Sequence, residues 1–287
     1  MERITLSQVP RYSFYVKRSL QAIDYGADDA RMLAMLEERT KAPVTREMMV
    51  ERLAGCETGE FLADAMRRLR RDVMIALIAR DTTGLADFEE VVRTMSDLAE
   101  VTVSAAVRVH SRDLARRYGV PTSAEGVPQD LLVVGMGKLG GRELNVSSDI
   151  DLIFVYDEAG DTKTKDEIPD SREIVCKHEI FECHSKRVIS AIKDVEGEGL
   201  VFRGDMRFRA LGGRGPLVHL QLLFLGAGPG VLIGGPGVVV HAGVFLHRFH
   251  HSEPLPGTGH VDLGALVGDD VGAAHLAGDG DIHILDQ

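Results

Sequence analysis

Residues 131–156 combine three features that few folds accommodate together: an apolar run, a glycine-rich turn and two aspartates one residue apart. Side chains alternate between the two faces of a strand, so Asp149 and Asp151 are predicted to share one face. The opposite, buried face is then formed by Ile150, Leu152 and Phe154. Two carboxylates suit one hard cation, and a glycine-rich turn lets backbone N–H groups approach a phosphate. The run therefore predicts metal-assisted chemistry on a nucleotide.

The same glycines also allow a different interpretation. Gly135, Gly137 and Gly140 fit the dinucleotide-binding pattern G-x-G-x-x-G, with Asp157 about 20 residues further on. That fold needs a full helix between its first two strands, and such a crossover takes roughly a dozen residues or more. Only residues 141–148 separate the glycines from the next apolar run. The dinucleotide interpretation is therefore the less favoured of the two.

A third element, residues 201–209, alternates strictly between apolar and polar side chains. The predicted buried face consists of Phe202, Met206 and Phe208, and the polar face consists of Arg203, Asp205, Arg207 and Arg209. One acid among three arginines suits a third metal ligand beside phosphate-binding cations. A solvated sheet face, and aspartates that merely cap a turn, remain the structural alternatives.

The part of the chain before this core is predicted to be helical. Apolar residues recur at three- or four-residue spacing over 62–77 and over 88–99, which indicates two amphipathic helices. Gly119 and Pro121 are expected to end the second one. A third helix is predicted from Ser171, a suitable N-cap, to about Ile192.

The run from Gly135 to Phe154, GMGKLGGRELNVSSDIDLIF, closely resembles the glutamine synthetase adenylyltransferase/adenylyl-removing enzyme family of the nucleotidyltransferase superfamily. Residues 202–207 resemble the strand that carries the family's third carboxylate, and residues 215–218 resemble the segment that follows it. The resemblance covers most of residues 60–218. The motif E-L-N-x-S-S-D-I-D-L-I-F is similar to that of the N-terminal, deadenylylating half of the family's enzyme rather than to that of its C-terminal, adenylylating half.

This resemblance implies an α+β fold, with a helical region at 1–125 and a nucleotidyltransferase core at 126–218 that contains a mixed sheet flanked by helices. It implies phosphorolysis: inorganic phosphate attacks the AMP phosphorus on a tyrosine of glutamine synthetase and releases ADP. Phosphoryl transfer of this kind depends mainly on positioning and charge stabilisation. The adenylylating direction, which uses ATP, shares the metal chemistry and stays open.

The resemblance also implies the site residues. Mg²⁺ would be held by Asp149, Asp151 and Asp205. The nucleotide and phosphate would be bound by Gly137, Lys138, Gly140, Gly141, Ser148, Arg203 and Arg207. Implied partners are glutamine synthetase, a PII-type signalling protein, ADP or ATP, and phosphate. At 287 residues the chain has room for one catalytic module, so an inactive, truncated fragment that keeps only a protein-binding surface is the alternative to an enzyme.

Composition and charge limit the kinds of partner and the cellular compartment that we expect for this chain. The net charge of −11 argues against general nucleic-acid binding, because phosphate-backbone binding favours a basic surface. The start MERITLSQVP lacks the apolar stretch of a signal peptide, and three cysteines form no disulfide framework. These features predict a soluble cytoplasmic protein.

A cluster of cysteines and histidines and a run of basic residues are both interpreted as structural rather than functional features. The spacing of Cys176, His178, Cys183 and His184 is wrong for a zinc site on one helix, which favours buried cysteines and surface histidines. The basic run at 66–71 could dock an acidic partner, but a solvated helix face is the preferred interpretation.

Residues 219–287 differ in composition from the rest of the chain. They contain 14 glycines, eight of the 11 histidines, one arginine and no lysine. Our hypothesis is that the reading frame changes near Val218, which predicts an irregular, disordered or poorly packed tail. Residues 215–247 contain no Asp, Glu, Lys or Arg, but prolines and repeated glycines disfavour a membrane-spanning helix there.

Overall fold

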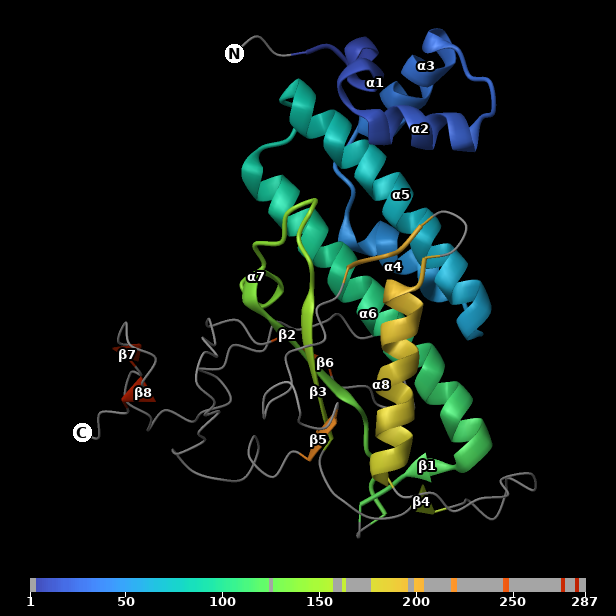
Figure 1. Cartoon of the computed structure of the whole chain (residues 1–287), viewed down its shortest axis with the longest axis vertical. Helices are drawn as coiled ribbons and strands as arrows, with labels where there is room; N and C mark the ends of the chain where they lie inside the picture. Colours follow the sequence, from blue (N-terminus) through green and yellow to red (C-terminus); the bar gives the residue numbers. More distant parts are fainter. Residues whose placement is uncertain are drawn as a thin grey trace. The chain divides into compact units, whose positions relative to one another are not determined.

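The computed structural model describes residues 4–123, 126–156, 162–163, 177–195 and 199–203, together with short strands at 218–220, 245–247, 275–276 and 282–283. The chain forms two compact units. Figure 1 shows the order of the helices and strands along the chain. The helical unit comprises residues 1–106, 142–148 and 191–203, and the sheet unit comprises 107–141, 149–190 and 204–287. Both units are discontinuous in sequence, whereas the regions predicted above are consecutive; the boundaries of those regions stay predictions.

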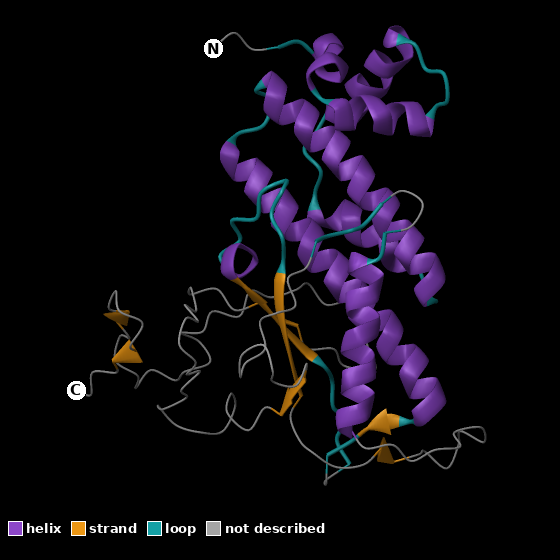
Figure 2. Cartoon of the chain, in the orientation of Figure 1, coloured by secondary structure: helices purple, strands orange, loops and turns teal. Residues whose placement is uncertain are grey.

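The helical unit is built from short helices followed by two long ones (purple in Figure 2). In chain order these are η1 (Leu6–Gln8), α1 (Val9–Tyr12), α2 (Phe14–Ile23), α3 (Asp29–Thr40), α4 (Arg46–Ala54), α5 (Gly59–Thr83) and α6 (Phe88–Tyr118), of which α6 continues into the sheet unit. The two predicted amphipathic stripes lie on α5 and α6, so both helices are confirmed. The second ends directly before Gly119, as expected.

Side chains that cap the first turn fix the starts of several helices, among them α2, α3 and α4. Each cap accepts a hydrogen bond from the backbone N–H three residues later, at 3.2 Å for Ser13, 2.9 Å for Asp28 and 3.4 Å for Thr45. A helix leaves its first N–H groups without partners in the helix, and these oxygens satisfy one of them in α2, α3 and α4.

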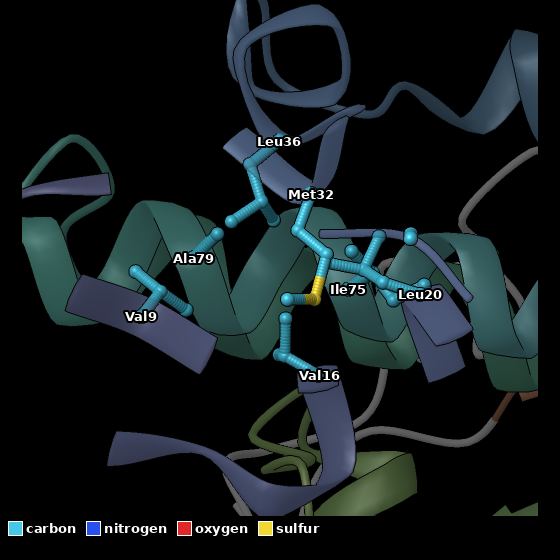
Figure 3. Packing of buried hydrophobic residues seen from close by; sticks show 8 residues of the cluster. Val9, Val16, Leu20, Met32, Leu36, Ile75 and Ala79 are labelled. Atoms are coloured by element: carbon cyan, nitrogen blue, oxygen red, sulfur yellow. The ribbon is translucent and has the colours of Figure 1, made fainter. Parts of the chain in front are cut away.

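The core of the first three helices is formed against the C-terminal half of α5. Figure 3 shows its buried side chains: Val9, Val16, Leu20, Met32, Leu36, Ile75 and Ala79. Each of the leucines and valines among them is fully buried. Burying such a side chain stabilises the fold by about 1.5–3 kcal/mol. The short helices α1–α3 therefore depend on α5 for most of their stability, because helices of this length are marginal alone.

Arg80 joins the ends of three helices. Its guanidinium donates to both carboxylate oxygens of Glu90 on α6, at 2.6 and 3.0 Å, and to the backbone oxygen of Thr40 at the end of α3, at 2.8 Å. The hydrogen bond to Glu90 raises the pKa of Arg80. Gly84 ends α5 in the left-handed conformation, with φ at 74°, which glycine adopts without steric cost.

The basic run on α5 is not a uniformly solvated face, so that interpretation was wrong. Arg67 is only 6% exposed. The guanidinium carbon of Arg70 lies 5.7 Å from the centre of the Phe202 ring. Burial lowers the pKa of Arg70. Only part of the run is solvated, as with Arg68, which pairs with Asp64 one turn away.

The sheet unit contains a four-stranded sheet in the order β5-β3-β2-β6. Its strands are β2 (Leu132–Met136), β3 (Asp151–Tyr156), β5 (Val218–Leu220) and β6 (Phe245–His247). The pairs β2–β3 and β2–β6 are antiparallel and β3–β5 is parallel, so the sheet is mixed. Two small pairs complete the strands: β1 (Val120–Pro121) with β4 (Thr162–Lys163), and β7 (His275–Leu276) with β8 (Ile282–His283). The α+β class is confirmed.

One helix, α8 (Lys177–Lys193), lies between β4 and β5 in the chain and contacts β3 in the sheet unit. The rings of Tyr156 and Phe181 stack with centres 4.9 Å apart, and the Tyr156 hydroxyl lies 3.1 Å from Nδ1 of His178. His184 is buried, so the interpretation as a surface histidine was wrong for it, and its Nε2 lies 2.9 Å from the backbone oxygen of Val107. The predicted helix is confirmed from residue 177; residues 171–176, including Cys176, lie outside the described residues.

The region 219–287 contributes the last two residues of β5 and the strands β6, β7 and β8, and its remaining residues lie outside the described part of the chain. The frame-change hypothesis and the expected poor packing therefore stay predictions. None of the helices in the described part of the chain has the length and apolar character needed to cross a bilayer.

Candidate active site

The two aspartates lie where β3 begins. Asp151 is the first residue of β3, so Asp149 stands just before the strand rather than within it as predicted. The expected alternation is nevertheless confirmed. Asp149 is exposed and Asp151 half-buried. Between and beyond them, the buried positions are Ile150, Leu152, Phe154, Val155 and Tyr156, so the alternation holds from residue 149 to residue 154. Both carboxylates are therefore directed away from the face that Ile150, Leu152 and Phe154 bury.

The glycine turn leads directly out of β2. Met136, the last residue of β2, pairs across the antiparallel ladder with Asp151. The chain then forms α7 (Gly137–Gly140), which Figure 1 shows at the end of β2. Because α7 has a single turn and β2 and β3 are antiparallel, the dinucleotide interpretation is excluded: it requires a full helix between parallel strands.

Gly137 leaves space beside the Asp151 carboxylate. Its φ is +56°, in the left-handed region, where side chains are rarely found. A Cβ atom placed on Gly137 would lie 3.6 Å from Oδ2 of Asp151. Glycine therefore serves two needs here: it permits the turn, and it keeps the approach to the carboxylate clear of a side chain.

The other residues of the turn have distinct surroundings. Gly135 lies so close to Leu139 that a Cβ atom would come within 3.0 Å of its Cγ atom, so glycine lets α7 pack on β2. Lys138 is exposed and Gly140 is buried. The N–H of Gly141 donates to the backbone oxygen of Gly137 at 3.0 Å and closes the turn. Lys138 is thus free to face solvent while the glycines hold the backbone.

After Gly141, residues 142–148 belong to the helical unit and contact α6 there. Arg142 donates to Glu100 Oε1 and to Asp97 Oδ1, each at 2.6 Å. Leu144 is fully buried, and its N–H donates to Ser96 Oγ at 3.3 Å. This network holds residues 142–148 against α6, and it was not predicted from the sequence. The available signal was Asp97 and Glu100, two acids within a stretch of α6, residues 94–107, that is otherwise uncharged.

The segment ends in a short turn that includes Ser148. Ser148 Oγ accepts a hydrogen bond from the N–H of Asn145 at 3.4 Å, and Asn145 Oδ1 accepts from the N–H of Ser147 at 3.1 Å. Arg203, another predicted site residue, is exposed, and its Nη2 donates to the backbone oxygen of Ser147 at 2.7 Å. Arg203 therefore contacts the residue next to Ser148 within the helical unit.

Two predicted site residues, Asp205 and Arg207, lie outside the described residues. Their convergence with Asp149 and Asp151 stays a prediction. Within the described part of the chain, no group of three His, Cys, Asp or Glu side chains is placed to hold a metal ion. The two aspartates still fit Mg²⁺, which in proteins binds through one or two carboxylates and completes its shell with water and substrate phosphates.

Comparison with known proteins decides the family. Residues 5–221 match the family described as Glutamate-ammonia ligase adenylyltransferase. The chain belongs to this adenylyltransferase family. The resemblance seen in the glycine turn and the aspartate pair is thereby confirmed, and the match ends close to Val218, where the composition changes.

Individual adenylyltransferase relatives support the same family assignment. The chain is 47% identical over 188 residues to the "Bifunctional glutamine synthetase adenylyltransferase/adenylyl-removing enzyme" of Aromatoleum aromaticum, which covers 65% of this chain and 19% of the relative. The protein of the same name from Ralstonia nicotianae is 42% identical over 213 residues, covering 72% of this chain and 21% of that protein. The chain thus spans about a fifth of the length of these relatives.

Proposed function

We propose that this chain carries a nucleotidyltransferase centre that removes AMP from adenylylated glutamine synthetase by phosphorolysis, in the cytoplasm. The observation that carries the proposal is the pairing of Asp151 with the end of β2, which sets its carboxylate beside the space left by Gly137. Relatives that share this region are named for the adenylylation and deadenylylation of glutamine synthetase.

In the proposed reaction, an oxygen of inorganic phosphate forms a bond to the AMP phosphorus while the bond to the tyrosine oxygen breaks. The products are ADP and the tyrosine hydroxyl, which takes up a proton. Asp149 and Asp151, with Asp205 as the third member, would hold Mg²⁺. When bound, Mg²⁺ supplies charge stabilisation at the attacking and leaving oxygens.

The remaining predicted residues would bind the phosphate groups. The glycines of the turn, Gly137, Gly140 and Gly141, would let the backbone approach the phosphate, although the N–H of Gly141 already donates to the backbone oxygen of Gly137. Lys138 and Ser148 would supply a charge and a hydroxyl donor, and the guanidinium groups of Arg203 and Arg207 would neutralise phosphate oxygens. A PII-type signalling protein is the proposed regulator of this reaction.

Release of ADP is the direct test. The full chain, incubated with adenylylated glutamine synthetase, Mg²⁺ and phosphate, is expected to produce ADP. Asp149→Asn and Asp151→Asn should each lower the rate at least about 100-fold, because loss of a metal ligand removes several kcal/mol of charge stabilisation. Asp64→Asn, on the exposed side of α5, is the matched control and should leave the rate unchanged.

The outcomes separate the alternatives. ADP formation that persists in both variants would show that these carboxylates do not hold the catalytic metal. AMP transfer from ATP to unmodified glutamine synthetase, without ADP release from the adenylylated form, would assign the opposite direction. A wild-type chain that binds glutamine synthetase but catalyses neither reaction would be the non-catalytic fragment.

A further inference from the structure

Residues 142–148 connect the glycine turn to the aspartates. These seven residues belong to the helical unit, which holds them through contacts with α6. The segment is peptide-bonded to Gly141 at one end and to Asp149 at the other. Its main contact is the planar guanidinium of Arg142, whose two terminal nitrogens reach two different carboxylates, Glu100 and Asp97, at 2.6 Å each. Hydrogen bonds between ionised groups are roughly twice as strong as neutral ones, and a planar guanidinium fixes direction as well as distance.

The two carboxylates are shared with a second arginine. Arg46 at the start of α4 donates to Asp97 Oδ1 at 3.0 Å and to Glu100 Oε2 at 2.5 Å. The cluster therefore balances two positive and two negative charges. The Glu100 side chain is 3% exposed and that of Asp97 is 12% exposed. Removal of either arginine leaves buried negative charge poorly compensated, which is costly in a protein interior.

The backbone of Arg142 adds a second observation. Its φ is +55°, and among the described residues it is the only non-glycine residue with a positive φ. Such a conformation is unfavourable for a residue with a side chain and persists where the surroundings determine it. Here the surroundings are the two carboxylates at one end of the side chain and buried Leu144, hydrogen-bonded to Ser96, two residues later.

We propose that Arg142 is a positioning residue. Its guanidinium pairs with Asp97 and Glu100 and so fixes residues 142–148, the segment that joins the glycine turn to the aspartates. This inference rests on the proposed function for its catalytic consequence. A segment that is held at Arg142 and Leu144 restricts the positions of Gly141 and Asp149, to which it is covalently joined. A displacement of about 1 Å in a catalytic group costs on the order of 100-fold in rate.

The test compares Arg142→Gly with Arg46→Gln in the full chain. Glycine accepts the left-handed backbone without steric strain, so Arg142→Gly removes the guanidinium contacts without forcing the backbone into a new conformation. Arg46→Gln removes the same charge from the same carboxylates but leaves the segment's own contact in place. Amide hydrogen exchange in residues 143–148 should become at least about tenfold faster in Arg142→Gly and remain near wild type in Arg46→Gln.

Kinetics supply the second readout. In Arg142→Gly, kcat for ADP release should fall about 10- to 100-fold while KM for phosphate changes little, because positioning rather than binding is lost. Arg142→Lys keeps the charge without the fork and should restore only part of kcat. In Arg46→Gln, kcat should remain near wild type although thermal stability falls.

Unchanged exchange in Arg142→Gly would overturn the inference, as would an equal kcat loss in Arg46→Gln, which would mark the cluster as merely structural. A wild-type chain that releases no ADP would refute the proposed function instead. In that case the exchange comparison alone decides whether Arg142 holds the segment.

Discussion

His110, on the part of α6 in the sheet unit, is a buried imidazole with both ring nitrogens lacking a hydrogen-bond partner. Burial lowers the pKa of His110, and the charge of Arg187 lowers it further, while Asp113 opposes both. The residue therefore favours its neutral form in the folded state. Its polar atoms cost free energy that an apolar side chain of similar size avoids.

We expect His110→Leu to raise the free energy of unfolding by about 1 kcal/mol at pH 7, measured by urea denaturation. The gain should increase at acidic pH. Below an ordinary histidine pKa of about 6.5, His110 binds a proton in the unfolded wild type but stays neutral in the folded state. The free energy of unfolding of the wild type therefore falls as pH falls through that range. His110→Leu lacks this contribution and should show a flatter pH dependence.

His184→Leu is the matched control, because His184 is equally buried but hydrogen-bonded to the backbone oxygen of Val107. It should destabilise the fold by about 0.5–1.5 kcal/mol, because it removes a buried hydrogen bond, although the Val107 oxygen keeps its place in the hydrogen-bond pattern of α6. Equal losses in both variants would show that His110 makes a favourable interaction and would contradict this account.

At the residue scale, what could be predicted depended on distance along the chain. The exposure of Asp149 and the partial exposure of Asp151 on either side of buried Ile150 followed from a period of two, although Asp149 lies just before β3. The fork of Arg142 onto Asp97 joins residues 45 positions apart, and no local pattern specifies such a pair. The burial of Arg67 within a basic run has the same cause, because tertiary packing rather than the run itself decides exposure.

At the element scale, the helix caps give a paired prediction. Asp28 accepts a hydrogen bond from the first turn of α3, whereas the Thr58 side chain at the start of α5 makes no capping hydrogen bond. Asp28→Ala should lower the free energy of unfolding by about 1 kcal/mol, and Thr58→Ala should change it by less than about 0.5 kcal/mol. Chemical denaturation of the two variants provides the comparison, and a Thr58→Ala loss as large as that of Asp28→Ala would refute the capping argument.

The elements themselves followed from periodicity where the pattern was long. The stripes of α5 and α6 specified two helices, and Gly119 marked the end of the second. The glycine turn was ambiguous, because the same three glycines serve a dinucleotide fold and a nucleotidyltransferase turn. The antiparallel register that pairs Met136 with Asp151 resolved it, and strand direction is not encoded in either strand alone.

At the scale of the whole molecule, the hypothesis of a frame change near Val218 has a direct test. The family match ends at residue 221, and residues 219–287 have the unusual composition described above. Translation of the other two frames of the underlying DNA beyond codon 218 should reveal a continuation similar to the adenylyltransferase family. If neither frame contains one, the hypothesis is wrong and the present tail is the true continuation.

The central claim is that Asp149, Asp151 and Asp205 hold a divalent ion beside the turn at Gly137. A crystal structure of the full chain with Mn²⁺ and ADP tests it most directly, because the anomalous signal of Mn²⁺ locates the ion independently of the protein. We predict an ion bound by carboxylate oxygens of all three aspartates, at roughly 2.0–2.2 Å. An ion held elsewhere, or an Asp205 carboxylate too distant to share an ion with Asp149 and Asp151, would contradict the account.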